Sequence, residues 1–248
     1  MTTLANFRPR SALEIVDGTF TLFREHFATL VAISAVIRLP FAIAAFLVPE
    51  AYSTLVDRSG NLFVAIAYGA TAVLIYQSLA GKRLDLGESF GGIQVTYGTL
   101  VFAQLLSGLM IAFGTVLLVI PGIIAFIWTA VAIPAAAIEG HSSTEAISRS
   151  RNLARTNAWH ILGTMVLAWG VLLVIMIATI FGLGMLAGAS GLGERVSQLL
   201  LQMVIIVLMP IPSVATTLLY VDLRVRREAL DVEATLDMLA ASTPAGTA

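Results

Sequence analysis

The sequence of 248 residues contains no cysteine and few charged residues. The lack of cysteine excludes disulfides and thiolate metal sites, and it gives no information about the redox state of the compartment. Only 12% of the residues are charged and 58% are hydrophobic, whereas a soluble domain carries about 25% charged residues. One soluble core of this length cannot hide so much apolar side chain, so a bilayer must solvate it. The net charge of −1 predicts no nucleic-acid partner.

Recognisable chemical motifs are also scarce. The three histidines, His26, His141 and His160, lack the clustered spacing of a metal site. No acidic residue falls well inside a predicted span, which argues against a carboxylate proton relay. The segment GLGMLAG (182–188) lacks the spacing and the preceding strand of a dinucleotide loop, and no G-x-S-x-G motif supports a serine nucleophile. We therefore expect no catalytic residues, no metal and no cofactor.

What the sequence does contain is long apolar stretches. A span needs roughly 20 apolar residues, and four runs qualify: Phe27–Pro49, Asn61–Gly81, Trp159–Leu186 and Val196–Tyr220. The block Thr99–Ile138 has no formal charge, but as one helix it would be roughly 60 Å long, about twice the bilayer core. We expect it to turn back at Pro121–Gly122, since proline ends a helix and glycine permits a tight turn. The sequence thus predicts an all-α polytopic membrane protein with six transmembrane helices in three hairpins.

The basic residues predict the orientation of these spans. Lys and Arg collect in cytoplasmic loops. Eleven of them fall on one predicted side and only Arg58 and Arg195 on the other; the eleven are Arg8, Arg10, Arg24, Lys82, Arg83, Arg149, Arg151, Arg155, Arg224, Arg226 and Arg227. We therefore expect a multi-pass protein of the cytoplasmic membrane with both termini in the cytoplasm.

A short pattern recurs before each predicted hairpin: SALE (11–14), DLGE (85–88) and SSTE (142–145). Ser or Asp followed three residues later by Glu is a helix-capping box, and apolar residues follow each box at helical spacing. The pattern predicts three cytoplasmic amphipathic helices, each leading into a hairpin. It also suggests one membrane domain of three repeats, 11–81, 85–138 and 142–221, closed by an amphipathic helix at 222–240.

Four segments resemble a known family: FRPRSALEIVDGTFTLFREHF (7–27), LLVIPGIIAFIWTAVAIPAAAIEG (117–140), TEAISRSRNLAR (144–155) and TTLLYVDLRVRREALD (216–231). They are similar to the membrane domain of glycerophosphoryl diester phosphodiesterases. The resemblance covers nearly the whole chain and implies a stand-alone membrane domain. The soluble catalytic barrel found in some relatives has no counterpart in this sequence, so the family's activity is not carried over.

One arginine, Arg38, lies within a predicted span near the membrane midplane, where a charge costs at least about 2.5–3.5 kcal/mol. Pro40 leaves the carbonyl of Val36 without a helical donor, and further polar candidates on other spans are Tyr76, Gln77 and Gln104. Two interpretations stay open: a structural arginine bonded to these groups, or the wall of a water-filled, anion-binding cavity. Both predict that Arg38 faces the helix bundle.

Two further features concern possible partners. Six arginines on the predicted cytoplasmic side, Arg149, Arg151, Arg155, Arg224, Arg226 and Arg227, either set the topology alone or also bind anionic lipid headgroups. Gly184 and Gly188 form a G-x-x-x-G motif, which indicates close helix packing within the subunit or a homodimer contact.

These features favour a non-enzymatic integral membrane protein, either a lipid-associated scaffold or an accessory subunit with a membrane or peripheral protein partner. The alternative is a transporter or channel for a small or lipid-like solute, which the polar and proline residues inside the spans would suit. A membrane-embedded enzyme ranks third.

Overall fold

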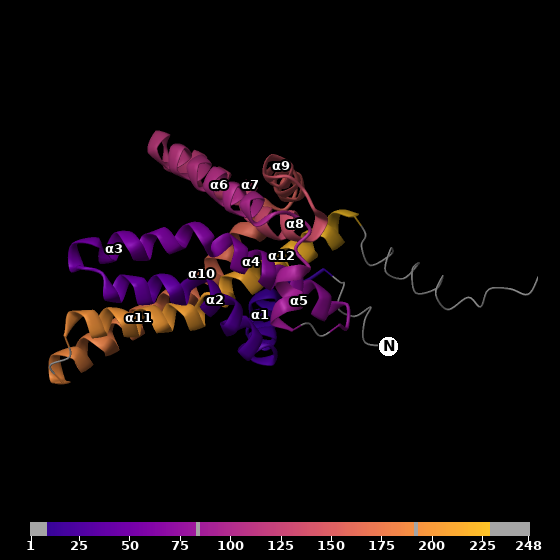
Figure 1. Ribbon diagram of the computed structural model, residues 1–248. Helices are drawn as coiled ribbons and strands as arrows, with labels where there is room; N and C mark the ends of the chain where they lie inside the picture. The colour runs from indigo at the N-terminus through magenta and orange to yellow at the C-terminus, as the bar shows by residue number, and fades with distance from the viewer. Residues whose placement is uncertain (1–8, 83–84, 191–192, 229–248) are drawn as a thin grey trace, which may run out of the picture.

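The computed structural model describes residues 9–82, 85–190 and 193–228, and the regular elements in these ranges are all helices. Six helical stretches are long and apolar enough to cross a bilayer. Figure 1 shows long helices that extend from one end of the molecule, where the shorter helices gather. The chain is a polytopic all-α membrane protein, as its sequence predicts.

The six stretches form three hairpins, and the second span of each hairpin is built from two α-helices, with a short 3-10 helix between them in the first hairpin. The first hairpin consists of α2 (Phe27–Leu47), α3 (Glu50–Ser59), the short 3-10 helix η2 (Gly60–Phe63) and α4 (Val64–Leu79). The second consists of α6 (Tyr97–Leu117), α7 (Val119–Thr129) and α8 (Ala132–Glu139). The third consists of α10 (Ala158–Ser190), α11 (Glu194–Leu208) and α12 (Pro210–Glu228).

A short helix precedes each hairpin, as the capping boxes predict: α1 (Ala12–Glu25), α5 (Leu86–Gly91) and α9 (Ser143–Ala154). In the first box Glu14 accepts the Ser11 N–H at 2.7 Å, and the Glu14 N–H donates to the Ser11 hydroxyl at 3.2 Å. The Asp85–Glu88 box repeats this geometry. Hydrogen bonds from the Ser142 hydroxyl and N–H hold the pKa of the Glu145 carboxyl below its ordinary value. The three glutamates therefore serve as caps. We call the end of the molecule that holds α1, α5 and α9 the box end, and the opposite end, where the hairpins turn, the hairpin end.

Each second span is interrupted part-way, and proline explains two of the three breaks. Pro134 cannot donate to the carbonyl of Ala130, and α7 gives way to α8 at that point. Pro210 and Pro212 likewise remove two donors at the junction of α11 and α12. In the first hairpin the interruption is the 3-10 turn η2, which starts at Gly60.

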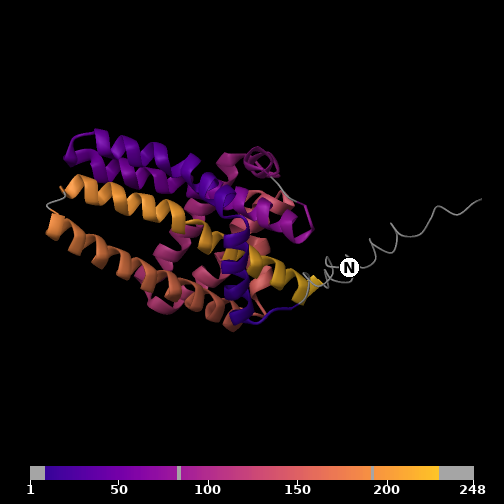
Figure 2. The same ribbon diagram turned by 90° about the horizontal axis from the view of Figure 1, so that it is seen from below.

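The core is made by the halves of these second spans that lie nearer the box end. Helix α4 packs against both α8 and α12, and most of its side chains are buried. The capped helices surround this core: α5 packs on α4, α9 on α8, and α1 on α12. Figure 2 shows α1, in indigo, crossing α12, in yellow. The contact between α1 and α12 brings the start of the described chain against its end and closes the arrangement.

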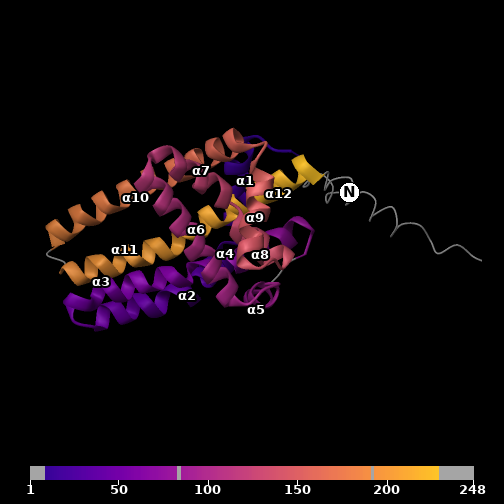
Figure 3. The same cartoon turned by 90° about the horizontal axis from the view of Figure 1, so that it is seen from above.

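The outer parts of the hairpins are much less buried. Helix α2 packs against α3 of its own hairpin and α11 of the third, and Figures 1 and 3 show these three helices side by side. The α6–α7 hairpin is inclined to this group. Helices α6 and α10 expose large apolar side chains along most of their length, including Phe113 and Val174. Acyl chains of a bilayer are the natural environment for such surfaces.

The turn of the second hairpin differs from our expectation. It lies at Leu118, the one residue between α6 and α7, and Pro121 sits in the first turn of α7, where a missing N–H costs nothing. Gly122 serves close packing instead of the turn. A Cβ on Gly122 would lie 2.2 Å from the Thr115 hydroxyl oxygen, and one on Gly114 would lie 2.8 Å from the Gly122 nitrogen.

Two other expected boundaries also shift. The second span begins at Glu50, not near Asn61, so the first connection shrinks to Val48–Pro49 and α3 returns along α2. Pro49 and the acidic Glu50 form an ordinary helix start. At the other end of the chain, no separate helix starts at residue 222, because α12 runs unbroken from Pro210 to Glu228. The rest of the expected 222–240 helix lies outside the described residues.

The predicted orientation can be tested with single cysteines, because the chain has none of its own. Ala51 at the hairpin end and Ser148 on α9 are both exposed. If the basic box end faces the cytoplasm, an impermeant thiol reagent applied to whole cells should label Ala51→Cys and spare Ser148→Cys. Both variants should react once the cells are permeabilised. Labelling of Ser148→Cys in intact cells would reverse the orientation.

The packing of the second hairpin yields a stability prediction. Gly114→Ala should destabilise the protein by about 1–3 kcal/mol, because the new methyl group meets backbone atoms of α7. Gly108→Ala on the same helix is the matched control. A Cβ there meets nothing within 4 Å, so this change should be neutral or stabilise by up to about 1 kcal/mol. Thermal unfolding in detergent measures both, and equal effects would contradict the close contact.

Candidate functional site

Arg38 of α2 is buried, with only 3% of its surface exposed, and it is held by side chains of three other segments. Its Nη2 donates to Asp57 Oδ1 of α3 at 3.0 Å and to Gln202 Oε1 of α11 at 3.1 Å. Its Nη1 donates to Asn61 Oδ1 of η2 at 2.9 Å and to the Asp57 carbonyl at 3.3 Å. Four of its five N–H donors are therefore engaged. We call Arg38, Asp57, Asn61 and Gln202 the Arg38 cluster.

The break at η2 allows Arg38 to come this close to the backbone. A Cβ on Gly60 would lie 2.9 Å from Arg38 Nη1, so a larger residue would push the guanidinium away. At the break two carbonyl groups leave the regular i to i+4 pattern, and each accepts a side-chain donor in addition to a nearby backbone N–H. The Asp57 carbonyl accepts from Arg38, and the Asn61 carbonyl accepts from Gln104 Nε2 of α6 at 2.7 Å. The irregular backbone thus has its partners within the protein, as the bilayer core requires.

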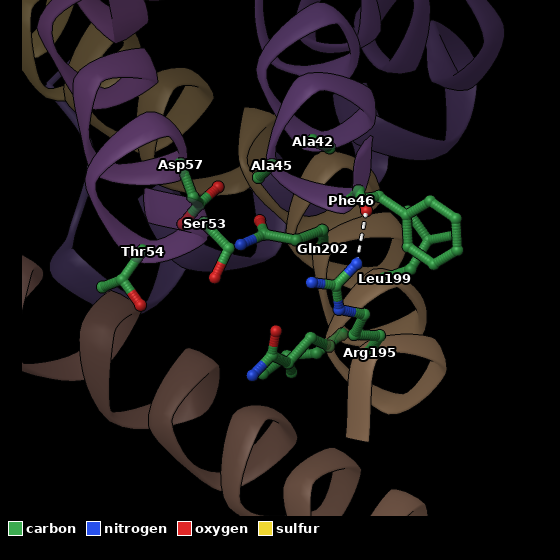
Figure 4. Close-up of a pocket in the computed structure, with 11 residues that line it drawn as sticks. Ala42, Ala45, Phe46, Ser53, Thr54, Asp57, Arg195, Leu199 and Gln202 are labelled. Carbon is green, nitrogen blue, oxygen red and sulfur yellow. Dashed lines mark hydrogen bonds between the residues drawn. The ribbon is translucent and has the colours of Figure 1, made fainter. Parts of the chain in front are cut away.

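A pocket of about 130 Å³ lies between α2, α3 and α11, on the hairpin-end side of the Arg38 cluster. Apolar residues of α2 and α11 form part of its wall. Its polar lining residues are Ser53, Thr54, Asp57, Arg195, Gln198 and Gln202. Figure 4 shows the Arg195 guanidinium and Asp57 on opposite sides of the space, with the Gln202 amide between them. The bundle therefore holds a charged, hydrogen-bonding pocket among apolar helices.

The structure rearranges the polar site that the sequence suggested. Gln104 belongs to it, one step from Arg38 through Asn61. Tyr76 and Gln77 lie in the last turn of α4 at the box end. Among the described residues no hydrogen bond joins either of them to Arg38. Asp57, which lay outside our predicted spans, belongs to the candidate span Glu50–Leu79 and offsets the charge of Arg38.

Three members of the Arg38 cluster were therefore missed: Asp57, Asn61 and Gln202. Asp57 fell in what looked like a polar loop and Asn61 was the first residue of the predicted span Asn61–Gly81, although the two are four residues apart and would share a helix face. Gln202 is the only polar residue between Leu199 and Met209. An isolated polar residue in such a run was the available signal for this site.

A second ionic centre lies at the box end around Glu139, the last residue of α8. Its carboxylate accepts from Arg149 Nε of α9 at 2.7 Å and from the Tyr220 hydroxyl of α12 at 2.5 Å. Arg149 also binds Glu228, and Arg224 lies within ion-pair distance of both glutamates. Its hydrogen bonds with Glu139 raise the pKa of Arg149 above the ordinary arginine value. This centre joins α9 to the core helices α8 and α12.

A third centre surrounds Asp222 of α12, which is 1% exposed. Asp222 accepts the backbone N–H of Arg10 at 2.6 Å, His160 Nε2 of α10 at 2.8 Å and Arg226 Nε at 2.7 Å. Arg226 also donates to the Arg10 carbonyl at 2.6 Å. These bonds fix the start of α1 and the start of α10 to α12, so a single buried carboxylate helps to close the molecule.

Most of the six arginines expected to contact lipid have partners within the protein. Arg149, Arg224 and Arg226 bind carboxylates, and Arg227 donates to the Asn152 carbonyl. The Arg151 guanidinium lies 4.3 Å from the ring centroid of Trp128. Arg155 is exposed, without a recorded contact among the described residues. Lipid binding stays a prediction, and Arg151 and Arg155 are the residues best placed for it.

The glycine motif and the three histidines do not form a ligand site in the part of the chain that the structure describes. Gly184 is exposed and a Cβ there would meet nothing within 4 Å, so it does not provide close packing within the subunit. The surroundings of Gly188 lie outside the described residues. His26 contacts Ser78, His141 contacts Glu139 and His160 contacts Asp222. In the part of the chain that the structure describes, no three His, Cys, Asp or Glu residues form a metal-binding group.

Comparison with protein-family models, curated proteins and solved structures gives no match for this chain. The resemblance to the phosphodiesterase membrane domain therefore stays a prediction from the four sequence segments. The class of protein that the fold itself defines is a polytopic membrane protein with six candidate spans.

The Arg38 cluster predicts strongly non-additive effects on stability. Arg38→Leu and Asp57→Leu should each cost roughly 3 kcal/mol, the lower end for a broken buried ion pair, because the Asp57 side chain is 23% exposed. The double variant should lose far less than the sum, since neither charge is then left alone. Thermal unfolding in detergent measures all three. Arg58→Leu on the exposed face of α3 is the control, and additive losses would show that the two residues are not coupled.

Proposed function

We propose that this protein is a non-enzymatic integral membrane protein that acts as a lipid-associated scaffold or as an accessory subunit of a membrane complex. We place it in the cytoplasmic membrane with the box end and both termini in the cytoplasm, on the evidence of the Lys and Arg distribution. The resemblance to the phosphodiesterase membrane domain supports the same kind of protein and brings no activity with it.

The observation that carries this proposal is the uncovered face of α10. Only 11% of its most apolar segment is buried, although it is one of the longest helices in the molecule. One stripe follows a heptad spacing, with a residue every three or four positions. It begins at the half-buried Gly163 and continues through the exposed residues Val166, Gly170, Leu173, Ile177, Ile180 and Gly184. Cβ atoms on its three glycines would meet nothing within 4 Å. We call this stripe the α10 seam.

Such a stripe suits contact with another helix more than contact with lipid alone. Side chains repeating every 3.5 residues form the seam of a left-handed helix pair, and small residues let two backbones approach closely in a membrane. The seam continues the homodimer motif at Gly184 toward the box end by three turns or more. The occupant we propose is a second copy of the chain, which would make the protein a self-associating platform.

Box-end architecture also supports a platform role. The three capped helices are held to the core by Glu139, Asp222 and their arginine partners. A surface fixed in this way presents a constant shape to lipid headgroups or to a peripheral protein. Because those arginines bind carboxylates within the chain, we assign them to holding the surface together.

Cross-linking in native membranes tests the α10 seam. Leu173→Cys, 60% exposed and within the seam, should form a covalent dimer with a short bismaleimide. Val171→Cys is the matched control, because Val171 is 37% exposed on a different face of the same helix. Equal yields from both positions, or no dimer from Leu173→Cys, would exclude self-association through the seam.

A second candidate function, a transporter or channel for a small or lipid-like solute, is favoured by the pocket beside the Arg38 cluster. The terminal nitrogens of Arg38 are saturated by protein acceptors. Arg38 is thus suited to shaping the pocket, and its neighbours are the groups available to a solute.

A further inference from the structure

The hydrogen bonding of the Arg38 cluster determines which groups face the pocket. A guanidinium only donates, so the Gln202 atom that it contacts must be the carbonyl oxygen. The Gln202 amide nitrogen is therefore turned away from Arg38, and Figure 4 shows it directed toward Ser53 and Asp57. Asp57 uses Oδ1 for Arg38, which leaves Oδ2 as an acceptor. The pocket thus holds a fixed donor and a fixed acceptor.

Arg195 supplies the second charge. It lies at the start of α11 and makes only long contacts, 3.4 Å to the Phe46 carbonyl and 3.3 Å to the Val48 carbonyl. Among the described residues it forms no ion pair, and in Figure 4 it faces the space across from Asp57. Thr54 on the Asp57 side adds a hydroxyl with no recorded partner there. Arg38, Arg195 and Asp57 together give the pocket one net positive charge.

This arrangement selects a ligand by charge. A simple oxyanion would satisfy Arg195 and the Gln202 amide but would leave Asp57 facing another negative charge, and like charges at short range repel. A simple amine would meet the opposite problem at Arg195. A molecule with an ammonium at one end and an oxyanion at the other satisfies both sides. The volume of about 130 Å³ is close to that of a cavity of about 150 Å³ that accepts benzene, so the partly open pocket holds a group of roughly that size, and the end of a slightly larger molecule extends out of it.

We propose that the pocket between α2, α3 and α11 binds a small zwitterion, with its phosphate or carboxylate on Arg195 and Gln202 and its ammonium on Asp57. The ligand is either a free solute or the headgroup of an aminophospholipid, since the chemistry is the same. The inference goes beyond the scaffold role. It shares its pocket with the second candidate function but needs only binding, so failure of transport would leave it intact.

Isothermal titration of the full chain in phosphatidylglycerol nanodiscs, whose lipid carries no ammonium group, tests this site with phosphorylethanolamine as the probe. We expect saturable binding, and we expect Arg195→Gln to weaken it about tenfold or more, as the loss of a charge-assisted hydrogen bond does. Arg58→Gln removes the same charge from the exposed face of α3 and should leave binding unchanged. Thr54→Val keeps the side-chain shape but removes a hydroxyl that lines the pocket, so it should also weaken binding. This variant tests the site if Arg195→Gln fails to fold.

Two more probes test the charge argument and the source of the ligand. Methyl phosphate and ethanolamine each carry half of the zwitterion, and each should bind at least tenfold more weakly than phosphorylethanolamine. Mass spectrometry of protein from phosphatidylethanolamine nanodiscs then identifies the source. A retained lipid that Arg195→Gln loses indicates a headgroup, and binding of the free probe alone indicates a solute. The proposal is overturned if the wild type binds no probe at millimolar concentration, if methyl phosphate binds equally well, or if Arg58→Gln weakens binding as much as Arg195→Gln.

Discussion

The bilayer core offers no hydrogen bonds, and this constraint shapes the interruptions at η2 and between α7 and α8. A helix break frees backbone groups that must then be satisfied within the protein. At the break between α7 and α8 the N–H of Val131 donates to the Ser150 hydroxyl of α9. At η2 the carbonyls of Asp57 and Asn61 accept from Arg38 and Gln104. These two breaks therefore each bind a side chain from another helix, which ties the broken spans to their neighbours.

The same reasoning explains why the charged groups gather in a few places. A carboxylate removed from water needs several donors, and Glu139 and Asp222 obtain them from different helices. The bonds to Glu139 join the second and third hairpins, and those to Asp222 join the start of α1 to α12. Such bonds add little net stability over apolar packing but make one arrangement far better than its alternatives. The charged residues in this way specify which helices lie next to each other in an otherwise apolar bundle.

Arg38 and the pocket beside it illustrate how structural and binding roles can be divided among neighbouring residues. Arg38 is enclosed by α2, α3, η2 and α11, and its terminal N–H groups donate hydrogen bonds to protein acceptors. In doing so it orients Gln202 and one oxygen of Asp57, which then line the pocket together with Arg195. A solute would meet groups that were already aligned before it arrived, and pre-alignment lowers the ordering cost of binding.

Local patterns in the sequence were sufficient to predict how many spans there are and where the capped helices begin, but not the breaks within the second spans. The six spans follow from length and apolar content, and the capped helices α1, α5 and α9 follow from boxes of four residues, because both depend on neighbours along the chain. Contacts between residues far apart in the chain could not be predicted from these local patterns. The turn at Leu118 depends on how closely Gly114 and Gly122 approach, and the partners of Arg38 come from positions 19 to 164 residues away. A single charge in a span indicates that a partner must exist, since the bilayer makes an unpaired one costly. Which residue it is depends on how the hairpins pack, and only the tertiary structure decides that.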